Sequence, residues 1–390
     1  MDGPSATHLD PESDFLSNPA AQALCVALEN GGHRAYFVGG CVRNAVMGVP
    51  ISDIDIATDA VPDQVIELSN KAGFRAIPTG IDHGTITVVV QDQPFEVTTF
   101  RRDVETDGRR AVIAFSTDMA EDAHRRDFTM NALYADRHGQ LADPVHGLQD
   151  ARAGRVRFIE DAGQRIREDY LRALRFFRFS AQYAPADAAW DADALAGIAE
   201  NLDGLQSLSA ERVGSEMLKL LGAADPAPAL SIMQQTGVLA QILPGSDPTY
   251  VGPLIHLEQM VDAPIDPIAR LAALGGQDVH DRLRLSRRNQ RHLDSILTLS
   301  TTMGGPKVLG QMGGVDAGRG AFLLRSAYGN APITIEQIDD VARGASAVFP
   351  IEASDLPHLS GPALGAELKA LKQIWLDSDL SKTKDDLLHP

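Results

Sequence analysis

The 390-residue sequence has only two cysteines, Cys25 and Cys41, and aromatic residues make up only 5% of it. Two thiols cannot build a disulfide framework or a thiolate zinc site, so we expect no disulfide partner and a reducing, cytoplasmic setting. Long apolar runs are missing too, because a stretch such as Ile86–Val90 is far shorter than the roughly 20 residues of a membrane-spanning helix. Met1–Asn18 is polar and interrupted by proline, unlike a signal peptide. The sequence therefore predicts a soluble protein with no membrane partner.

Lysine is scarce, and acidic residues outnumber basic ones. The chain has 35 Lys+Arg, of which only 7 are Lys, against 53 Asp+Glu, and its formal net charge is −18. Such acidity ordinarily argues against a nucleic-acid partner, since phosphate binding relies on basic patches. Residues 101–178, however, hold 15 of the 28 Arg and only 14 Asp+Glu. Arginine offers a planar fork for bidentate phosphate contacts, so we predict a locally basic centre in an acidic chain.

The hydrophobic fraction of 44% is ample for buried cores and excludes a disordered chain. After a predicted flexible lead over residues 1–20, the pattern changes to that of a small mixed α/β domain. The expected elements are strands over 35–38, 52–57, 84–90 and 95–100, a turn over 91–94, and helices over 42–47 and 62–73.

From about residue 127 the pattern predicts helices nearly to the end of the chain. Over residues 165–183, Ile166, Tyr170, Leu174 and Phe177 recur with helical spacing, which predicts one continuous helix. Another helix is expected to begin at Ser209 as its N-cap. Proline and glycine pairs are expected to separate the later helices, at 225–226, 244–245, 275–276, 304–306 and 361–362. The predicted fold class is therefore α+β, with a mixed α/β head and an all-α remainder.

The first candidate site combines a glycine pair with two nearby carboxylates. Gly39-Gly40 opens a helix and exposes backbone N–H groups suited to phosphate, and Arg43 adds a charge. Asp53 and Asp55 alternate on the expected strand, so they share one face and could share divalent cations. Each part alone is more often a turn or a solvated strand face. Their order along the chain favours a metal–nucleotide site.

Three further groups of residues are candidates. Glu96, on the strand over 95–100, is either a third carboxylate or an exposed strand residue. In the segment 125–132, the pair Arg125-Arg126 and Asp127 stand at what we expect to be a helix start, where they could bind triphosphate and ribose or could merely cap the helix and pair with each other. The third group recurs every three residues along the helix over 165–183, and consists of Asp169, Arg172, Arg175 and Arg178. That spacing suits a salt-bridge ladder, but the arginines outnumber the carboxylates.

Taken in sequence order, these motifs closely resemble the class II tRNA nucleotidyltransferase and poly(A) polymerase family. The resemblance covers about residues 36–221. It is carried by Gly39-Gly40-Cys41-Val42-Arg43, Asp53-Ile54-Asp55, the segment 125–132, Asp143-Pro144 with Gly147 and Asp150, and Glu168-Asp169 with Arg172 and Arg175. It implies a polymerase-β-like nucleotidyltransferase head followed by an all-α neck, body and tail. The expected boundaries are 1–20 for the lead, 21–137 for the head, 138–223 for the neck, 224–303 for the body and 304–390 for the tail.

The resemblance also implies a reaction and the residues that perform it. The reaction is template-independent addition of CCA to the tRNA acceptor end from CTP and ATP, with release of pyrophosphate. Asp53 and Asp55 would hold Mg²⁺, with Glu96 as a further catalytic carboxylate. The implied nucleotide-binding residues are Gly39, Gly40, Arg43, Arg126, Asp127, Asn131, Asp169, Arg172, Arg175 and Arg178. One departure is visible, because the family usually has Asp after the motif arginine and this chain has Asn44.

Base choice follows from hydrogen-bonding patterns. Cytosine and adenine both present an amino donor beside a ring-nitrogen acceptor, whereas uracil and guanine present the reverse. Asp169 could accept from the amino group while Arg172 donates to the ring nitrogen. Our hypothesis is that this pair acts as an amino-acid template for C and A.

Other functions remain open. The chain could be a poly(A) polymerase or add only part of CCA, or it could be a catalytically silent RNA-binding protein on the same scaffold. Intact Asp53 and Asp55 argue against the silent protein. Phosphohydrolase activity in the body is a further alternative, suggested by His256 and the dipeptide His280-Asp281, although no nearby Asp completes a metal-ligand set.

Overall fold

The computed structural model describes residues 8–11, 13–106 and 111–389. The chain forms two compact units, Met1–Leu208 and Ser209–Pro390. The first carries the β-sheets together with helices, and the second is helical in its described residues, which confirms the predicted fold class. Residues 1–7 and 12 of the predicted lead lie outside the described residues. The finer division into neck, body and tail stays a prediction.

The first unit is built on a seven-stranded sheet in the order β3-β4-β5-β2-β1-β8-β9, and β6 and β7 form a separate two-stranded sheet. Strands β2 and β5 are parallel, and the other neighbouring pairs are antiparallel. The strands are β1 Ala35–Val38, β2 Asp55–Thr58, β3 Arg75–Gly80, β4 Thr85–Val90, β5 Gln93–Thr99, β6 Arg101–Thr106, β7 Ala111–Phe115, β8 Tyr134–Ala135 and β9 Leu141–Ala142.

The β4–β5 hairpin is tighter than the sequence predicts. Gln91 and Asp92 alone form the turn, with φ of 50° and 62°, and Val90 pairs directly with Gln93. Two left-handed residues give a turn whose twist matches that of the flanking strands. The predicted turn over 91–94 is therefore wrong in length, and Pro94 lies within the strand.

Strands β8 and β9 correct the prediction that the chain is helical from about residue 127. Val38 of β1 pairs with Tyr134 of β8, and Tyr134 pairs in turn with Ala142 of β9. Strand β8 supplies hydrogen-bonding partners for the main chain of β1, whose edge would otherwise be unpaired. Local periodicity cannot reveal such a pairing, because its partner lies about a hundred residues away.

The helices of the first unit include three short 3₁₀ segments. They are α1 Pro19–Asn30, α2 Gly40–Met47, α3 Pro62–Lys71, η1 Ile81–His83, α4 Met119–His124, η2 Thr129–Asn131, α5 Leu148–Ala153, α6 Ala162–Glu168, α7 Leu171–Tyr183, α8 Ala192–Glu200 and η3 Leu202–Ser207.

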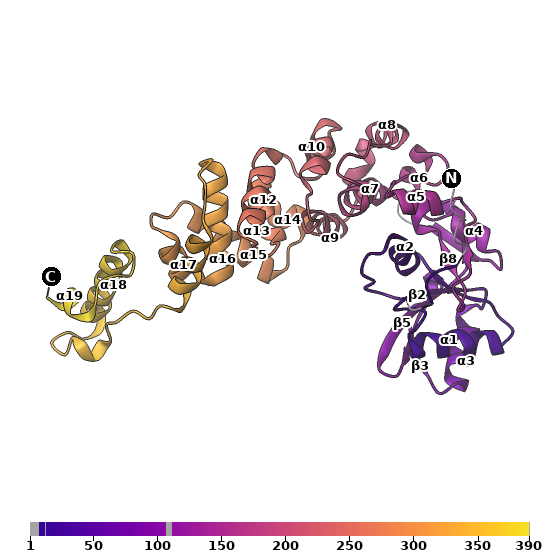
Figure 1. Ribbon diagram of the computed structural model, residues 1–390, viewed down its shortest axis with the longest axis horizontal. Coiled ribbons are helices and arrows are strands. Elements are labelled where there is room, and N and C mark those ends of the chain that lie inside the picture. The colour runs from indigo at the N-terminus through magenta and orange to yellow at the C-terminus, as the bar shows by residue number, and fades with distance from the viewer. Residues whose placement is uncertain (1–7, 12, 107–110, 390) are drawn as a thin grey trace. The chain divides into compact units, whose positions relative to one another are not determined.

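Helices α1 and α3 pack beside each other and against strand β4 (Figure 1). Their apolar faces are buried there, including Leu24, Leu28 and Val65, each with no exposed surface. Phe15 packs edge-on against Phe37, with ring centroids 4.7 Å apart. The described residues just before α1 are therefore packed on the head.

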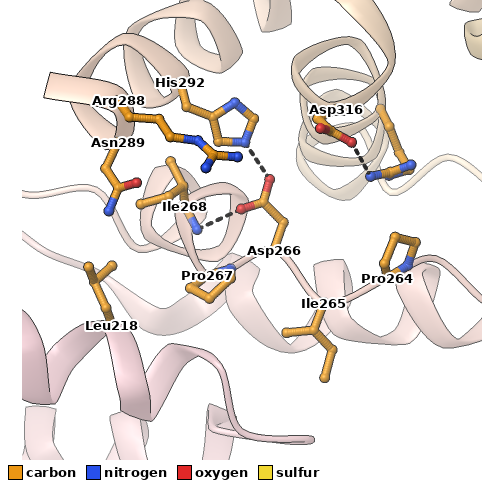
Figure 2. Close-up of a pocket in the computed structure, with 11 residues that line it drawn as sticks. Leu218, Pro264, Ile265, Asp266, Pro267, Ile268, Arg288, Asn289, His292 and Asp316 are labelled. Atoms are coloured by element: carbon orange, nitrogen blue, oxygen red, sulfur yellow. Dashed lines mark hydrogen bonds and ion pairs between the residues drawn. The ribbon is translucent and has the colours of Figure 1, made fainter. Parts of the chain in front are cut away.

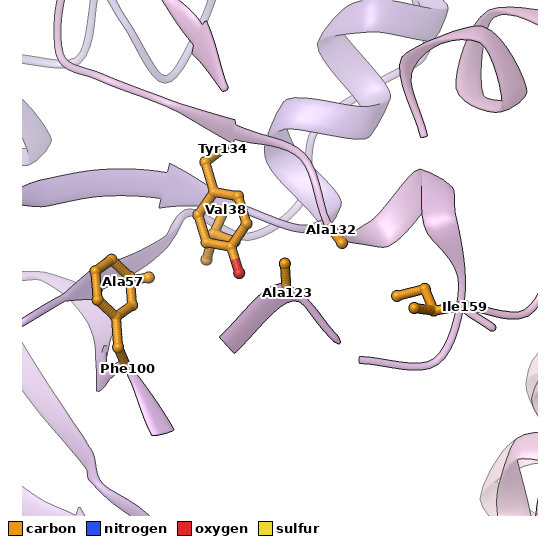
Figure 3. Packing of buried hydrophobic residues seen from close by; sticks show 7 residues of the cluster. All are labelled: Val38, Ala57, Phe100, Ala123, Ala132, Tyr134 and Ile159. Atoms are coloured by element: carbon orange, nitrogen blue, oxygen red, sulfur yellow. The ribbon is translucent and has the colours of Figure 1, made fainter. Parts of the chain in front are cut away.

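A second hydrophobic cluster joins the sheet to α4 and to Ile159, which lies shortly before α6 (Figure 3). Its members are Val38, Ala57, Phe100, Ala123, Ala132, Tyr134 and Ile159. The rings of Phe100 and Tyr134 meet edge-on, with centroids 6.3 Å apart. This packing fixes the ends of β1 and β2, from which the candidate site residues project.

The second unit consists of helices in its described residues. They are α9 Ala210–Leu221, α10 Ala227–Gln235, α11 Val238–Ile242, η4 Pro248–Tyr250, α12 Val251–Met260, α13 Pro267–Leu274, α14 Val279–Leu283, α15 Arg287–Ser300, α16 Pro306–Tyr328, α17 Ile335–Ser346, η5 Ala353–Asp355, α18 Gly361–Asp377 and α19 Lys384–Leu388. The expected N-cap Ser209 is confirmed, and the predicted proline and glycine breaks fall at helix boundaries.

Helix α13 is fixed at its start by Asp266, which lines a pocket of about 580 Å³ (Figure 2). Asp266 accepts a hydrogen bond from the Ile268 amide at 2.9 Å and pairs with His292 Nε2 at 2.7 Å. In the same pocket Arg319 pairs with Asp316 at 2.9 Å. The lining of this pocket therefore contains both acidic and basic side chains.

Among the described residues, no helix is both long and apolar enough to cross a membrane.

Candidate active site

Asp55 and Glu96 lie side by side where the parallel strands β2 and β5 begin their pairing. The strand β5 buries Phe95 and Val97 and leaves Glu96 exposed on the opposite face. A cavity of about 740 Å³ opens over this part of the sheet. It is lined by Asn18, Ser52, Asp53, Ile54, Asp55, Thr87, Gln93, Pro94, Phe95 and Glu96. The structure therefore brings the three predicted catalytic carboxylates to one cavity.

Asp53 lines this cavity, but it does not belong to a strand as the sequence predicts. Strand β2 begins at Asp55, and Asp53 lies in the irregular segment ahead of it. The expectation that a period of two places both aspartates on one strand face is therefore wrong. Pairing with β1 and β5 starts at Asp55 or later, so the ladder does not extend to Asp53. Asp53 instead accepts a hydrogen bond from Ser52 Oγ at 2.8 Å.

The electrostatics of Asp55 suit a cation-binding group. Burial raises the pKa of Asp55 to about 6, with further contributions from the charges of Glu96 and Asp53, while Arg126 opposes the increase. Among the described residues, no three His, Cys, Asp or Glu side chains form a complete metal-ligand set. Mg²⁺ is typically held by one or two carboxylates together with substrate phosphates. The donor chemistry here therefore fits a metal that arrives with its nucleotide.

The glycine turn after β1 faces two other predicted residues. Gly39 has φ of 70°, and a Cβ at this position would lie 3.4 Å from Arg126 Nη1 and 3.8 Å from the Asn131 carbonyl oxygen. A non-glycine residue would be strained in this conformation. The backbone of Gly39 is thus placed directly against Arg126 and Asn131.

Arg43 is buried, with 6% of its surface exposed. Its guanidinium donates to Asn131 Oδ1 at 2.5 Å, to Asn44 Oδ1 at 2.8 Å and to the Tyr183 hydroxyl at 2.7 Å. It also stacks over the Tyr183 ring, 4.2 Å from the centroid. Burial lowers the pKa of Arg43. Sequence reasoning missed Tyr183, because its position in the sequence gives no signal of this contact.

The segment around Arg126 corrects a second prediction. Helix α4 ends at His124 with Arg125 as its C-cap, so the Arg pair follows a helix rather than opening one. Asp122, which is buried, pairs with Arg125 and Arg126 at 2.9 Å each. The Tyr134 hydroxyl also donates to it at 2.7 Å. Sequence reasoning missed Asp122, although its spacing of three and four residues from the arginines is typical of helical ion pairs.

Asp127 connects this segment to helix α7. It accepts from Asn131 Nδ2 at 3.0 Å and from Arg175 Nε at 2.7 Å. Burial alone would raise the pKa of Asp127, but Arg175 and these hydrogen bonds lower it to about 2. Arg43, Asn131, Asp127 and Arg175 therefore form one continuous chain of hydrogen bonds. Four of the predicted nucleotide-binding residues meet in this chain.

The predicted continuous helix over residues 165–183 is interrupted at Asp169. Helix α6 ends at Glu168, Asp169 is extended with φ of −153°, and α7 begins at Leu171. Asp169 Oδ1 accepts from the Leu171 amide at 3.1 Å, which stabilises this new helix start. Asp169 therefore does not share a helical surface with the arginines that follow it, contrary to the prediction.

The arginines of α7 contact different partners. Arg172 pairs with Glu168 at 2.6 Å and donates to the Arg125 carbonyl oxygen at 2.7 Å. Arg178 donates to Gln182 at 3.0 Å and lies 4.4 Å from the centroid of the Phe179 ring. The three arginines Arg172, Arg175 and Arg178 thus start from one helix but meet different partners.

The alternative metal site in the second unit receives no support. His280 pairs with Asp294 at 3.0 Å, and His256 is exposed on α12. Asp281 lies beside His280 on the short helix α14. No cluster of three metal-ligating side chains contains these residues within the described part of the chain.

Comparison with known proteins places these features in a family. The model of the poly(A) polymerase head domain matches residues 35–157, and that of the probable RNA- and SrmB-binding site of polymerase A matches residues 191–249. The mitochondrial CCA tRNA nucleotidyltransferase 1 of Danio rerio is 32% identical over 400 residues, covering 97% of this chain and 91% of the relative. The chain belongs to the CCA tRNA nucleotidyltransferase family.

Other members of the CCA tRNA nucleotidyltransferase family match in sequence and in structure. The human mitochondrial CCA tRNA nucleotidyltransferase 1 is 42% identical over 212 residues, which cover 54% of this chain and about half (49%) of the relative's length. The crystal structure of the Bacillus stearothermophilus CCA-adding enzyme in complex with CTP has 29% identity and a TM-score of 0.74. That alignment covers 93% of this chain and 94% of the other. The resemblance inferred from the sequence motifs is confirmed.

Proposed function

We propose that this chain is a transferase that adds CCA to tRNA 3′ ends without a nucleic-acid template, using CTP and ATP and releasing pyrophosphate. The observation that carries the proposal is the meeting of Asp53, Asp55 and Glu96 at one cavity of the head. Membership of the CCA tRNA nucleotidyltransferase family supports the same reaction. The acceptor end of tRNA is the corresponding partner.

Asp53 and Asp55 are the proposed holders of Mg²⁺, and Glu96 is the proposed third catalytic carboxylate. When bound, the metal would lower the pKa of the primer 3′-hydroxyl and neutralise charge on the α-phosphate and the departing pyrophosphate. The repulsion among the carboxylates, which contributes to the raised pKa of Asp55, supports this role because a cation would relieve it. The remaining work of the protein is to position the primer and the nucleotide.

The proposed nucleotide pocket extends from the glycine turn to helix α7. Gly39 and Gly40 bring the main chain close to the nucleotide, and Asp122 orients Arg126 for contact with phosphate. Asp127 and Asn131 orient Arg43 and Arg175 through the buried chain of hydrogen bonds. Arg178, one turn after Arg175 on α7, completes the proposed pocket. The hydrogen bonds that link Arg43, Asn131, Asp127 and Arg175 support this set of residues, because they join predicted nucleotide-binding residues of α2 and α7.

Base selection by Asp169 and Arg172 is part of the proposal. Asp169 belongs to the break between α6 and α7, and Arg172 is held by Glu168 and the main chain. Asp169 would accept from the amino group of cytosine or adenine, and Arg172 would donate to the adjacent ring nitrogen. A uracil or guanine edge would set donor against donor and acceptor against acceptor. Full discrimination against UTP by Asp169→Ala would contradict this part.

A cytoplasmic location and the division into head, neck, body and tail complete the proposal. Cys25 and Cys41 are both buried as free thiols, and burial raises their pKa values to about 12 and about 11. Such thiols are chemically inert. The support for a reducing, cytoplasmic setting is the low cysteine content, two residues in the whole sequence.

The test is incubation of the purified protein and Mg²⁺ with tRNA that lacks its 3′ CCA, supplied with each nucleotide separately and together. We expect growth by one to three nucleotides only when CTP is present, and completion only with CTP and ATP. Asp55→Asn should abolish growth, whereas Asp82→Asn, the same change on the short helix η1 outside this cavity, should not. A long tail of A from ATP alone would replace the proposal with poly(A) polymerase activity, which the head-domain match to that family keeps as the second candidate.

A further inference from the structure

Asn44 links the buried Arg43 to the segment that carries Asp53. Its side chain is 9% exposed, and Oδ1 accepts hydrogen bonds from Arg43 Nε at 3.1 Å and Nη2 at 2.8 Å. Its Nδ2 donates to the main-chain oxygen of Pro50 at 2.6 Å. One amide group therefore bridges a fixed cation and the main chain just ahead of β2.

A second residue on the same face of α2 reaches the other end of this segment. The thiol of Cys41 lies 4.0 Å from the carbonyl oxygen of Asp55. Residues 41 and 44 are three apart, so their side chains are neighbours on the helix surface. Helix α2 thus contacts the segment 50–55 at both its ends. The segment needs such support because Ile51–Ile54 belongs to no strand or helix.

The support continues from Asn44 to helix α7. Arg43 donates to Asn131 and to Tyr183, and Asn131 donates to Asp127, which pairs with Arg175. All these contacts lie within the first unit. The position of Asn44, and through it that of Pro50, is therefore tied to the helix that carries the proposed nucleotide contacts.

We propose that Asn44 is a positioning residue that holds the segment 50–54, and thereby Asp53, in place for metal binding. The Asn44 amide accepts from Arg43 and donates to Pro50 at the same time, whereas an ionised carboxylate of the same size has no donor. Aspartate at this position would keep the contact with Arg43 and set two acceptors against each other at Pro50.

The inference deepens the proposed function and rests on it, so its test includes a measurement that is independent of activity. Hydrogen–deuterium exchange of the metal-free protein is compared for the wild type, Asn44→Asp and Asn44→Ala. Asn70→Asp is the matched control, because it makes the same chemical change at an exposed position of α3. We expect the amides of residues 51–54 to exchange about tenfold faster in both Asn44 variants, the size expected for loss of one buried hydrogen bond. Asn70→Asp should match the wild type.

Kinetics then show whether this support matters for the reaction. With tRNA lacking CCA, we expect kcat for both Asn44 variants to fall about tenfold and the half-saturating Mg²⁺ concentration to rise, with KM for CTP unchanged. A role confined to overall stability would lower the melting temperature without moving the Mg²⁺ dependence.

The outcomes separate the two proposals. If the wild type adds no nucleotide, the proposed function fails, and faster exchange over 51–54 still supports the role of Asn44. Unchanged exchange in folded variants, or faster exchange with wild-type kcat and Mg²⁺ dependence, overturns that role. Should Asn44→Asp not fold, Asn44→Ala decides alone, because it removes the Pro50 contact without adding a charge.

Discussion

At the scale of the residue, Asp55 combines a proposed catalytic role with an environment that disfavours its charged form. Burial first, and then Glu96 and Asp53, raise the pKa of its carboxyl from 3.8 to about 6. In the metal-free protein the folded state therefore keeps a proton that the unfolded state releases at lower pH. Because the folded state binds more protons, stability falls as the pH rises from about 4 to about 6. Ionised Asp55 therefore lowers the free energy of unfolding of the metal-free protein at neutral pH.

We predict that Asp55→Asn stabilises the metal-free protein at pH 7 by up to about 3 kcal/mol, the free energy that corresponds to about two pKa units. The same variant should lose nucleotide addition. The measurement is urea unfolding in EDTA at pH 4.5 and at pH 7, where the advantage of the variant should be clearly larger at the higher pH. Asp53→Asn is the control, because Asp53 is exposed and its loss should stop the reaction with a smaller gain in stability. Equal stability of the wild type and Asp55→Asn at pH 7 would contradict the argument.

At the scale of the element, buried ion pairs determine how helices meet. Arg270 on α13 is 1% exposed and pairs with Glu258 on α12 at 2.6 Å. It also donates to the carbonyl oxygens of Leu221 and Ala223, just after the end of α9. Burial raises the pKa of Glu258 although Arg270 opposes the increase. Three helices of the second unit therefore depend on one guanidinium.

Glu258→Gln should destabilise the second unit by about 3 kcal/mol, because it leaves Arg270 buried without its countercharge. The exposed pair Arg284–Glu211 provides the control, and Glu211→Gln should leave stability nearly unchanged. Thermal unfolding followed by circular dichroism measures both, since the second unit is helical. A melting temperature of Glu258→Gln equal to that of the wild type would show that the pair adds nothing.

At the scale of the whole molecule, the charge distribution limits how RNA is held. The negative charge lies outside residues 101–178, because these carry 15 Arg against 14 Asp+Glu while the whole chain has a net charge of −18. In the structure several of these arginines are paired with carboxylates, including Arg126 and Arg175. This pairing lowers the net positive charge that the described part of the segment offers to phosphates, and the acidic remainder disfavours non-specific RNA binding.

We therefore predict a shallow salt dependence of tRNA affinity. The slope of log K against log salt should correspond to about three or four neutralised phosphates, at roughly 0.9 per phosphate. Filter binding between about 50 and 200 mM salt measures the slope. Poly(U) of similar length controls for non-specific binding and should bind more weakly. A slope typical of about ten phosphates would contradict the prediction.

The elements that were predicted correctly depend on local sequence. Strand β1, the glycine turn after it and helix α3 with Pro62 in its first turn all follow from residues within one element. The break at Asp169 could not be predicted in this way, because the apolar spacing from Ile166 to Leu174 continues across it. Asp169 there accepts a hydrogen bond from a backbone amide, which periodicity does not register.

The sequence by itself determined the α+β fold class and the family, because composition, turn residues and ordered motifs are local properties of the chain. It also supplied the carboxylates and arginines of the candidate site. The tertiary structure decided how they are held: Asp53 lies outside the strand, Arg126 follows a helix, and Arg43 is buried. Only the folded chain joins Asn44 to Pro50 and Arg43 to Tyr183. The physical reason is that a buried polar group must find a partner, and that partner is selected by packing rather than by distance along the sequence.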